Sequence, residues 1–299
     1  NQKIIVEKYF NLLGMKNLLV TGALGYLGSA LADHFAEKYS LIRVVHNNAK
    51  EGEIAVELTN EDEVKDLSKN FSPNYIFHAA GRKAQACEKN PESALVNVLA
   101  SEFLTKYFSS TPIYFFSSDF VFDGEKGNYA ETDSPNPLTI YGKSKLQAEQ
   151  TYDQNRHCII RTAGLFDIEQ PGFLRYVFSH LSQNKPIEAF GDIYSTPTYL
   201  PYFCRYLEEM IGRGLTGLFH VAGRERVSRF EFARLIAKTH GYDPSLVLMA
   251  TAPEQFLSPR DSSLDSSKIR DLLSLEWPSL KVALEDMCDQ NSRLQNEKT

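Results

Sequence analysis

Three polar side chains, Ser118, Tyr141 and Lys145, have the types and the spacing of a proton-transfer site. Tyr141 and Lys145 are four positions apart, so on a helix they lie on one face, one turn apart. An ammonium at that distance favours the phenolate, which lowers the pKa of the tyrosine from about 10 towards the range of a general acid or base. The hydroxyl of Ser118, which follows an apolar run, can hydrogen-bond a carbonyl or alkoxide oxygen. A tyrosine four residues before a lysine is common on exposed helices, so this hypothesis needs support from elsewhere in the chain.

A glycine turn near the beginning of the chain gives that support. Gly22, Gly25 and Gly28 follow an apolar run at residues 18–20, and apolar side chains then recur every four residues as far as Phe35. This is the pattern of a strand, a tight turn and a helix, in which the backbone passes close to a pyrophosphate and the helix N-terminus faces the anion. The glycines are spaced three and three, unlike the two-and-three spacing of the standard fingerprint, so the turn alone is a weak signal. We nevertheless expect it to bind a dinucleotide.

The elements that position these residues alternate between short apolar strands and amphipathic helices. We predict strands at residues 18–20, 41–45, 54–58, 75–78, 112–116 and 157–161, and helices that begin at 60 and 141 or span 92–108, 200–211, 228–239 and 279–287. Strands separated by helices of this length form a parallel sheet with right-handed crossovers. The predicted fold is therefore α/β, a doubly wound parallel sheet (Rossmann-like) with a smaller α/β C-terminal substrate lobe.

The predicted domain organisation has four parts. Residues 1–14 are an extension before the first strand, and residues 15–166 are the dinucleotide-binding domain. Residues 167–289 are mainly a substrate-binding lobe, from which a strand at 217–221 can rejoin the main sheet. Residues 290–299 are a polar, frayed tail.

Composition excludes several classes of function. The chain has 299 residues, of which 42% are hydrophobic and 23% charged, and a net charge of -6. The absence of a basic stripe argues against nucleic acid or an anionic membrane as a partner, so small molecules are the expected ligands. Four distant cysteines and seven scattered histidines suggest neither a disulfide framework nor a metal site, and they fit the reducing cytoplasm. No apolar run has the length of a membrane helix, and residues 1–14 lack the features of a signal peptide.

The order of these motifs resembles a known enzyme group. The turn from Thr21 to Gly28, the strand end His78-Ala79-Ala80-Gly81, Ser118, and Tyr141 with Lys145 are similar to the extended short-chain dehydrogenase/reductase superfamily. The run from Ser117 to Gly124, Pro137-Leu138, and the segment from Tyr141 to Lys145 resemble more narrowly the dTDP-4-dehydrorhamnose reductase family. Cys87 to Asn97, Ser195 to Thr198 and Ser228 to Glu231 match it as well. The resemblance extends from Met15 to about Leu273.

The resemblance implies a role for each matching residue. Nicotinamide would donate hydride to a sugar ketone while Tyr141 protonates the developing alkoxide, Lys145 holds the nicotinamide ribose and tunes Tyr141, and Ser118 orients the carbonyl. Asn97 would brace the site through its helix, unless it is a helix-surface amide. Implied cofactor contacts are Gly22, Gly25, Tyr26, Leu27 and Gly28 at the pyrophosphate, Glu57 and Leu58 at the adenine, and Ala79, Ala80 and Gly81 at the ribose. The implied substrate contacts are Ser118, Asp119, Phe120, Gly164 and Arg260.

The end of the second strand bears on the choice of cofactor. An acidic residue there would hold a ribose 2′-hydroxyl and repel a 2′-phosphate, but the chain has His46, Asn47 and Asn48, with Arg43 and Lys50 nearby. This favours NADP(H), with NAD(H) remaining an alternative.

Two residues depart from the pattern of the rhamnose enzymes. Ser118 stands where they have threonine, which keeps the hydroxyl. Gly164 stands where they have a tryptophan that stacks on the substrate, so a large apolar contact is missing and the identity of the sugar stays open. Arg260 is a candidate for the phosphates of the sugar nucleotide, with a surface arginine as the alternative.

Three hypotheses of function follow from these observations. The first is an NAD(P)H-dependent reductase of a keto group on a nucleotide-activated sugar, a dTDP-4-keto-6-deoxyhexose. The second is a dihydrostreptose synthase, in which ring contraction precedes reduction and Gly164 provides room. The third is a non-catalytic NADP-binding module like the regulatory β subunit of methionine adenosyltransferase. A homodimer is compatible with each of them.

Overall fold

The computed structural model describes residues 14–168 and 172–296, so the predicted extension before Gly14 lies outside the described residues. The chain divides into two compact units. The first consists of the residues up to 117 together with 144–160, and the second of residues 118–143 together with those from 161 onwards.

A seven-stranded sheet, in the order β11-β6-β5-β4-β1-β2-β3, forms the α/β layer. The pairs β1/β2, β1/β4, β2/β3 and β4/β5 are parallel. Because the order runs outwards from β1 in both directions, the carboxyl ends of β1 and β4 lie at the point where doubly wound sheets bind ligands. The predicted sheet is confirmed. Its strands are β1 (Asn17–Thr21), β2 (Ser40–Val45), β3 (Glu53–Ala55), β4 (Tyr75–His78), β5 (Ile113–Ser118), β6 (Cys158–Thr162) and β11 (Gly217–His220).

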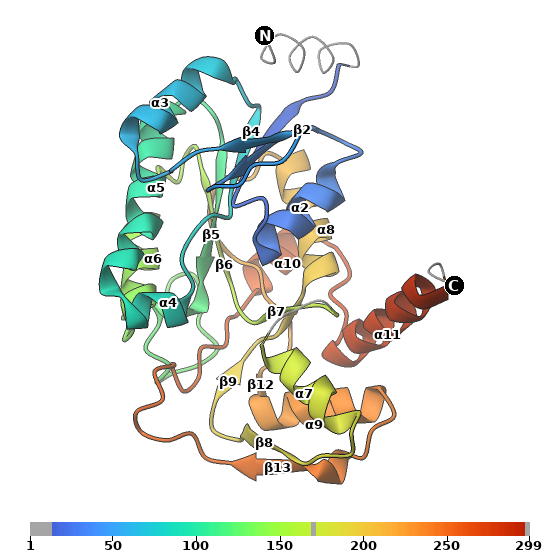
Figure 1. The fold of residues 1–299 in the computed structure, drawn as a ribbon. Helices are drawn as coiled ribbons and strands as arrows, with labels where there is room; N and C mark the ends of the chain where they lie inside the picture. The colour runs from blue at the N-terminus through green and yellow to red at the C-terminus, as the bar shows by residue number, and fades with distance from the viewer. Residues whose placement is uncertain (1–13, 169–171, 297–299) are drawn as a thin grey trace. The chain divides into compact units, whose positions relative to one another are not determined.

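Helices cover both faces of the sheet in the first unit. Figure 1 shows α2 on one face and α3, α5 and α6 on the other. The central residues of β1, Leu18, Leu19 and Val20, are apolar and fully buried, as expected of a strand covered on both sides. The helices are α2 (Tyr26–Phe35), α3 (Glu61–Asn70), α4 (Ala84–Lys89), α5 (Leu95–Tyr107) and α6 (Ile140–Glu149).

Local capping explains where several of these helices begin. Asn60 precedes α3, and its side chain accepts hydrogen bonds from the backbone of Asp62 and Glu63. The helix predicted at 92–108 begins instead as a 3₁₀ turn, η2 (Pro91–Ala94), and continues as α5. Pro91 fits that first turn because its missing N–H would have no helical partner. The third strand, predicted at 54–58, ends at Ala55.

The second unit contains three short two-stranded sheets. The strands pair as β7 (Leu165–Phe166) with β10 (Thr198–Tyr199), β9 (Tyr194–Ser195) with β12 (Val227–Ser228), and β8 (Ile187–Phe190) with β13 (Val247–Ala250). Its helices are η3 (Asp119–Val121), α7 (Phe173–Leu181), α8 (Leu200–Gly212), α9 (Arg229–Thr239), η4 (Pro244–Leu246), α10 (Ser267–Leu273) and α11 (Leu280–Asn296). The helices predicted at 200–211 and 228–239 are thus present, and α11 continues well beyond its predicted end at 287.

The core of the second unit lies between α7, α9, α11 and β8. Figure 1 shows α7 and α9 next to β8 and β13. Val177, Ile236 and Leu284, one from each of the three helices, are fully buried there. Each such side chain contributes about 1.5 to 3 kcal/mol of transfer free energy, so this core holds the loops of the unit in place. Within the described ranges, no helix combines the length and the hydropathy of a membrane span.

Candidate active site

The glycine turn after β1 has room for backbone only. Gly22 has a φ of +66°, and a Cβ there would lie 2.8 Å from the backbone of Ala80. A Cβ on Gly28 would lie 2.1 Å from the carbonyl oxygen of Gly22, and Gly25 donates its N–H to the same carbonyl at 2.8 Å. Only glycine fits these close approaches.

The N-terminus of α2, which follows this turn, is open to an anion. Gly25 is the N-cap residue, no side chain caps the helix, and the first turn, with Tyr26 and Leu27, has no acidic residue. With no side-chain cap in place, the helix N-terminus and the positive end of its dipole can face a pyrophosphate. These residues fit a dinucleotide.

Glu57, which is expected at the adenosine end, contacts His46 and Thr59. His46 Nδ1 lies 3.0 Å from Glu57 Oε2, and Thr59 donates to Glu57 Oε1 through its hydroxyl at 2.7 Å. Burial raises the pKa of Glu57, but the hydrogen bonds from Thr59 and the charge of His46 outweigh that effect and lower the pKa. Leu58 is buried, whereas Asn47 and Asn48 are exposed. Arg43, one of the cations that favoured NADP(H), is paired with Asp33 of α2 at 3.3 Å.

Hydrogen bonds join the end of β4 to the end of β1. His78 Nδ1 lies 2.7 Å from Thr21 Oγ1, which also accepts a hydrogen bond from the N–H of Ala80 at 3.2 Å. Burial, and then the charge of Lys145, lowers the pKa of His78 to about 3, so its imidazole is neutral. Ala79 and Gly81, also expected at the ribose, lie on either side of Ala80.

Asn97 is a buried brace and not a helix-surface amide, because only 1% of it is exposed. Its Oδ1 accepts a hydrogen bond from the N–H of Arg82 at 2.7 Å, and its Nδ2 donates to Ser144 Oγ at 2.9 Å. Asn97 therefore joins α5 to the residue that precedes Lys145. The sequence did not suggest a role for Ser144, because a serine inside a helix carries no signal of its partner.

Lys145 of α6 has a buried ammonium group. Its Nζ lies 4.2 Å from the ring centroid of Phe115. Burial lowers the pKa of Lys145 to about 8, although the nearby carboxylate of Glu149 acts to raise it. Glu149, which sequence reasoning missed, is itself buried and accepts a hydrogen bond from Ser117 Oγ at 2.5 Å. A cation with so little hydration acts strongly on groups near it.

Tyr141 lies one turn before Lys145 in the same helix, as predicted. Its ring packs edge to face against Phe120, with centroids 5.8 Å apart. The contact is close because the next residue is Gly142, where a Cβ would lie 2.1 Å from the carbonyl oxygen of Phe120. The start of α6 and the segment after β5 are therefore in direct contact.

Ser118 and Asp119 form a hydrogen-bonded cluster with Ser262. Ser118 Oγ donates to Asp119 Oδ1 at 2.9 Å and accepts from the N–H of Phe120 at 3.2 Å. Ser262 Oγ donates to Asp119 Oδ2 at 2.5 Å. Burial raises the pKa of Asp119 to about 6, even though both serine hydroxyls act to lower it. The sequence did not indicate Ser262, which is distant in the chain.

The other two predicted substrate residues lie in separate surroundings. Gly164 has a φ of +51°, a conformation that favours glycine over the tryptophan of the rhamnose enzymes. The guanidinium of Arg260 is held by Asp192 Oδ2 at 2.7 Å and by the carbonyls of Ala252 and Pro253. The positive charge of Arg260 is thus already paired with a carboxylate, which weakens the case for a phosphate contact.

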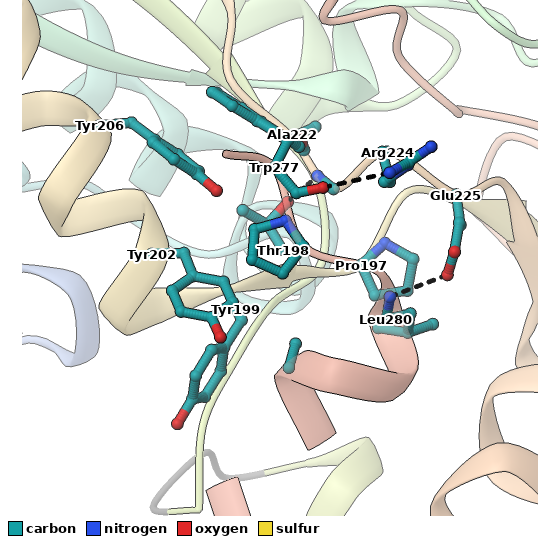
Figure 2. A pocket seen from close by; sticks show the side chains of 13 residues that line it. Pro197, Thr198, Tyr199, Tyr202, Tyr206, Ala222, Arg224, Glu225, Trp277 and Leu280 are labelled. Atoms are coloured by element: carbon teal, nitrogen blue, oxygen red, sulfur yellow. Dashed lines mark hydrogen bonds between the residues drawn. The ribbon is translucent and has the colours of Figure 1, made fainter. Parts of the chain in front are cut away.

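A small pocket in the second unit is distinct from all of the predicted site residues. Figure 2 shows it beside Trp277, whose ring stacks on that of Tyr206 with centroids 3.6 Å apart. Hydrogen bonds from Arg224 to the Trp277 carbonyl and from the Leu280 N–H to Glu225 hold the chain before α11. The cavity has a volume of about 20 Å³, which is room for about one water molecule. It is too small for a sugar nucleotide.

Among the residues that the structure describes, no cluster of metal-ligating side chains is present.

Comparison with known proteins gives a consistent family relationship. The family model described as RmlD substrate binding domain matches residues 15–293. The chain is 30% identical over 291 residues to methionine adenosyltransferase 2 subunit beta of Danio rerio, covering 91% of this chain and 90% of that protein. It is also 30% identical over 281 residues to the probable low-salt glycan biosynthesis reductase Agl14 of Haloferax volcanii, covering 88% and 94%.

Solved structures agree with this relationship. A hypothetical dTDP-4-dehydrorhamnose reductase from Sulfolobus tokodaii superposes with a TM-score of 0.82 at 34% identity, covering 90% of this chain and 98% of that one. A dTDP-4-dehydrorhamnose reductase from Bacillus anthracis, in complex with NADP, superposes with a TM-score of 0.82 at 24% identity, covering 92% and 99%. The second likeness bears on the fold alone.

Proposed function

The chain belongs to the RmlD substrate binding domain family, and from this premise we propose that it reduces a keto group on a nucleotide-activated sugar with NADPH. NADH is the alternative cofactor. The substrate class we propose is a dTDP-4-keto-6-deoxyhexose. The observation that carries the proposal is the buried ammonium of Lys145 one helical turn from Tyr141. The names of two relatives support it, a probable glycan biosynthesis reductase, Agl14, and a hypothetical dTDP-4-dehydrorhamnose reductase from Sulfolobus tokodaii.

The cofactor, when bound, supplies the hydride for the ketone carbon. The open N-terminus of α2 and the glycine turn bind its pyrophosphate. His46, Asn47, Asn48, Glu57 and Leu58 would contact its adenosine end, and Ala79, Ala80 and Gly81 would contact its ribose. That no acidic residue ends β2 favours a 2′-phosphate over a 2′-hydroxyl in this proposal. Arg43, being paired with Asp33, adds less to that preference than the sequence suggested.

Proton transfer is the task of Tyr141. Its phenol gives a proton to the oxygen of the ketone as that oxygen becomes an alkoxide, and the ammonium of Lys145 favours the phenolate that remains. Lys145 can do this while it is charged, and with a pKa of about 8 it is mostly charged at neutral pH. Asn97 holds α6 at the residue before Lys145 through Ser144.

Ser118 orients the carbonyl in this proposal. Its Oγ accepts from the N–H of Phe120, which holds the oxygen in place while the hydroxyl hydrogen can still rotate. The hydrogen of that hydroxyl now points to Asp119, and it must turn to the substrate oxygen for the carbonyl to be held. Since Asp119 also has the hydroxyl of Ser262, its carboxylate keeps a partner when Ser118 turns away.

A direct assay tests the proposal. Purified protein is mixed with enzymatically prepared dTDP-4-keto-rhamnose and either NADPH or NADH, absorbance of the reduced cofactor is followed, and the product is analysed by mass and NMR. We expect faster oxidation of NADPH and a six-membered dTDP-deoxyhexose. A five-membered branched sugar would indicate ring contraction before reduction, as in a dihydrostreptose synthase, for which Gly164 would leave room.

A second candidate function rests on the methionine adenosyltransferase relatives. The match to the Danio rerio subunit extends over 91% of this chain, so a regulatory module is a specific alternative. It predicts tight binding of NADP(H) with no oxidation of the reduced cofactor by any keto sugar. Retention of Ser118, Tyr141 and Lys145 favours the enzyme, because a binding module has no need of a proton donor.

A further inference from the structure

Arg229, the first residue of α9, has a backbone fixed from two sides. The preceding Ser228 forms a capping box with Glu231, in which each side chain accepts a hydrogen bond from the other residue's N–H, at 3.1 and 2.7 Å. The N–H of Arg229 donates to the carbonyl of Ile193 at 3.0 Å. The side chain of Arg229 therefore extends from a backbone position that is held in place within the second unit.

The guanidinium of Arg229 is partly buried between aromatic rings. Its Cζ lies 5.1 Å from the ring centroid of Phe256 and 5.9 Å from that of Phe173. Burial lowers the pKa of Arg229, although the charge of Asp119 acts to raise it. No residue in the described part of the chain accepts a hydrogen bond from this guanidinium or forms an ion pair with it. Partly desolvated charged donors of this kind normally have a partner.

Asp119 is the acidic residue whose charge acts on Arg229, but its carboxylate is hydrogen-bonded to other residues. Its two carboxylate oxygens accept hydrogen bonds from Ser118 and Ser262. Its charge is close enough to act on Arg229 without a direct ion pair. Hydrogen bonds give a second connection: Tyr194, the residue after Ile193, accepts from the N–H of Ser262 at 3.1 Å, and Ser262 donates to Asp119. The backbone of Arg229 is therefore connected through Ile193 and Tyr194 to the cluster that contains Ser118, the residue proposed to orient the substrate carbonyl.

Other arginines of this region have partners that Arg229 lacks. Arg226 donates to Asp261 Oδ2 at 2.6 Å and lies 3.7 Å from the ring centroid of Tyr194. Arg260 is bound to Asp192 and to two backbone carbonyls. Each of these two guanidinium groups already has a carboxylate as its partner, whereas Arg229 has no such ion pair among the described residues. The planar fork of a guanidinium matches phosphate and carboxylate groups.

We propose that Arg229 binds an oxyanion of the nucleotide sugar, either its diphosphate or a carboxylate on the sugar ring. The inference rests on the proposed function only in taking a nucleotide sugar as the ligand. The aromatic rings of Phe173 and Phe256 exclude part of the solvent around the guanidinium, which strengthens its interaction with an anion. Arg260 then has a structural role in its own segment, or joins Arg229 after releasing Asp192.

Calorimetric titration of the NADP⁺-loaded protein tests this proposal. The probes are UDP, dTDP, UDP-glucose and UDP-glucuronate, and the variant is Arg229→Gln. We expect the dissociation constants to rise by about 10- to 100-fold in the variant, as for loss of a charged hydrogen-bonding partner. If the diphosphate is the partner, all four probes weaken alike, and if a sugar carboxylate is the partner, only UDP-glucuronate weakens.

Two further variants separate binding from folding. Arg234→Gln is the matched control, because Arg234 lies in the same helix, over the ring of Phe230 at 5.6 Å, and is exposed. We expect it to leave all four affinities unchanged. Arg229→Lys keeps a cation between the rings, so we expect it to retain the thermal stability of the parent while recovering only part of the affinity. Equal affinities in Arg229→Gln and the parent, or no binding of any probe to the parent, would overturn the proposal.

The outcome is separable from that of the reductase assay. Oxidation of NADPH by a keto sugar, together with unchanged affinities in Arg229→Gln, would leave the function standing and remove the role of Arg229. Affinities that depend on Arg229, together with no oxidation of NADPH, would leave the anion site standing and remove the reductase.

Discussion

The glycine turn after β1 and the cluster around Asp119 are both candidate binding sites, but they are built from different lengths of chain. The turn comes from seven consecutive residues, Gly22 to Gly28, and works through backbone N–H groups. The cluster joins Asp119 to Ser262 by a hydrogen bond and to Arg229 by charge, and these three residues are far apart in sequence. A site made of backbone is visible as a local motif, whereas a site made of distant side chains becomes visible only in the fold.

The largest expected difference between the two sites is that Asp119, in the cluster, makes the unfolding free energy depend on pH. Its pKa is about 6 in the folded chain against an ordinary 3.8, so between these values the folded protein holds a proton that the unfolded chain has lost. The unfolding free energy should therefore fall as the pH rises from about 4 to about 6, by up to about 3 kcal/mol. Asp119→Asn should remove this fall, as measured by urea denaturation at several pH values.

Asp265 is a control for that experiment, because its pKa is shifted in the opposite direction to that of Asp119. Burial raises its pKa, but hydrogen bonds from Ser267 outweigh this and leave the pKa below its ordinary value. Its contribution to stability is present above the ordinary pKa and is lost as the pH falls. Asp265→Asn should thus destabilise the protein at pH 6 and less so at low pH. Parallel pH profiles for the parent and Asp119→Asn would contradict the buried environment described for Asp119.

A smaller effect tests the glycine turn. In Gly28→Ala the new Cβ would lie 2.1 Å from the carbonyl oxygen of Gly22, and backbone cannot move aside cheaply. We expect the unfolding free energy to fall by about 1 to 3 kcal/mol, as for other overpacked sites, and NADPH to bind more weakly. Urea denaturation and fluorescence titration of NADPH measure the two effects.

Gly212→Ala is the matched control for the turn. Gly212 ends α8, and a Cβ there would meet no atom within 4 Å. Alanine in a helix is favoured over glycine by about 0.5 to 1 kcal/mol, so this variant should be neutral or slightly more stable. If Gly28→Ala behaved like Gly212→Ala in both measurements, the tight turn would not be the feature that fits the cofactor.

Much of the fold could be predicted because its strands are short apolar runs between helices. Leu18 to Val20 is fully buried, and a short apolar run that ends at a glycine turn is typical of a central parallel strand. The 3₁₀ start of the segment after Pro91 was missed because a capping asparagine and a proline set the local turn, while the apolar pattern continues through it. The end of α11 was missed because the sequence after Met287 is polar and carries no apolar periodicity that would predict a helix.

The candidate site was predictable only where its residues signal their own role. Tyr141 and Lys145 do so by helical spacing. Gly164 was selected by the resemblance to the rhamnose enzymes, and its left-handed φ became known only from the structure. Arg260 was selected as a cation, yet its donors are used by Asp192 and by carbonyls. Arg229 was not selected, because what distinguishes it is the lack of a hydrogen-bond partner, and sequence does not record partners.

The central claim is that Tyr141 gives its proton to a sugar alkoxide, and Tyr141→Phe tests it most directly. The measurement is the turnover of NADPH with dTDP-4-keto-rhamnose, alongside the affinity for NADPH and the thermal stability of the variant. Turnover should fall by about 10² to 10⁴, as for loss of a positioned proton donor, with affinity and stability unchanged. Undiminished turnover would contradict the account and remove Tyr141 from the chemistry.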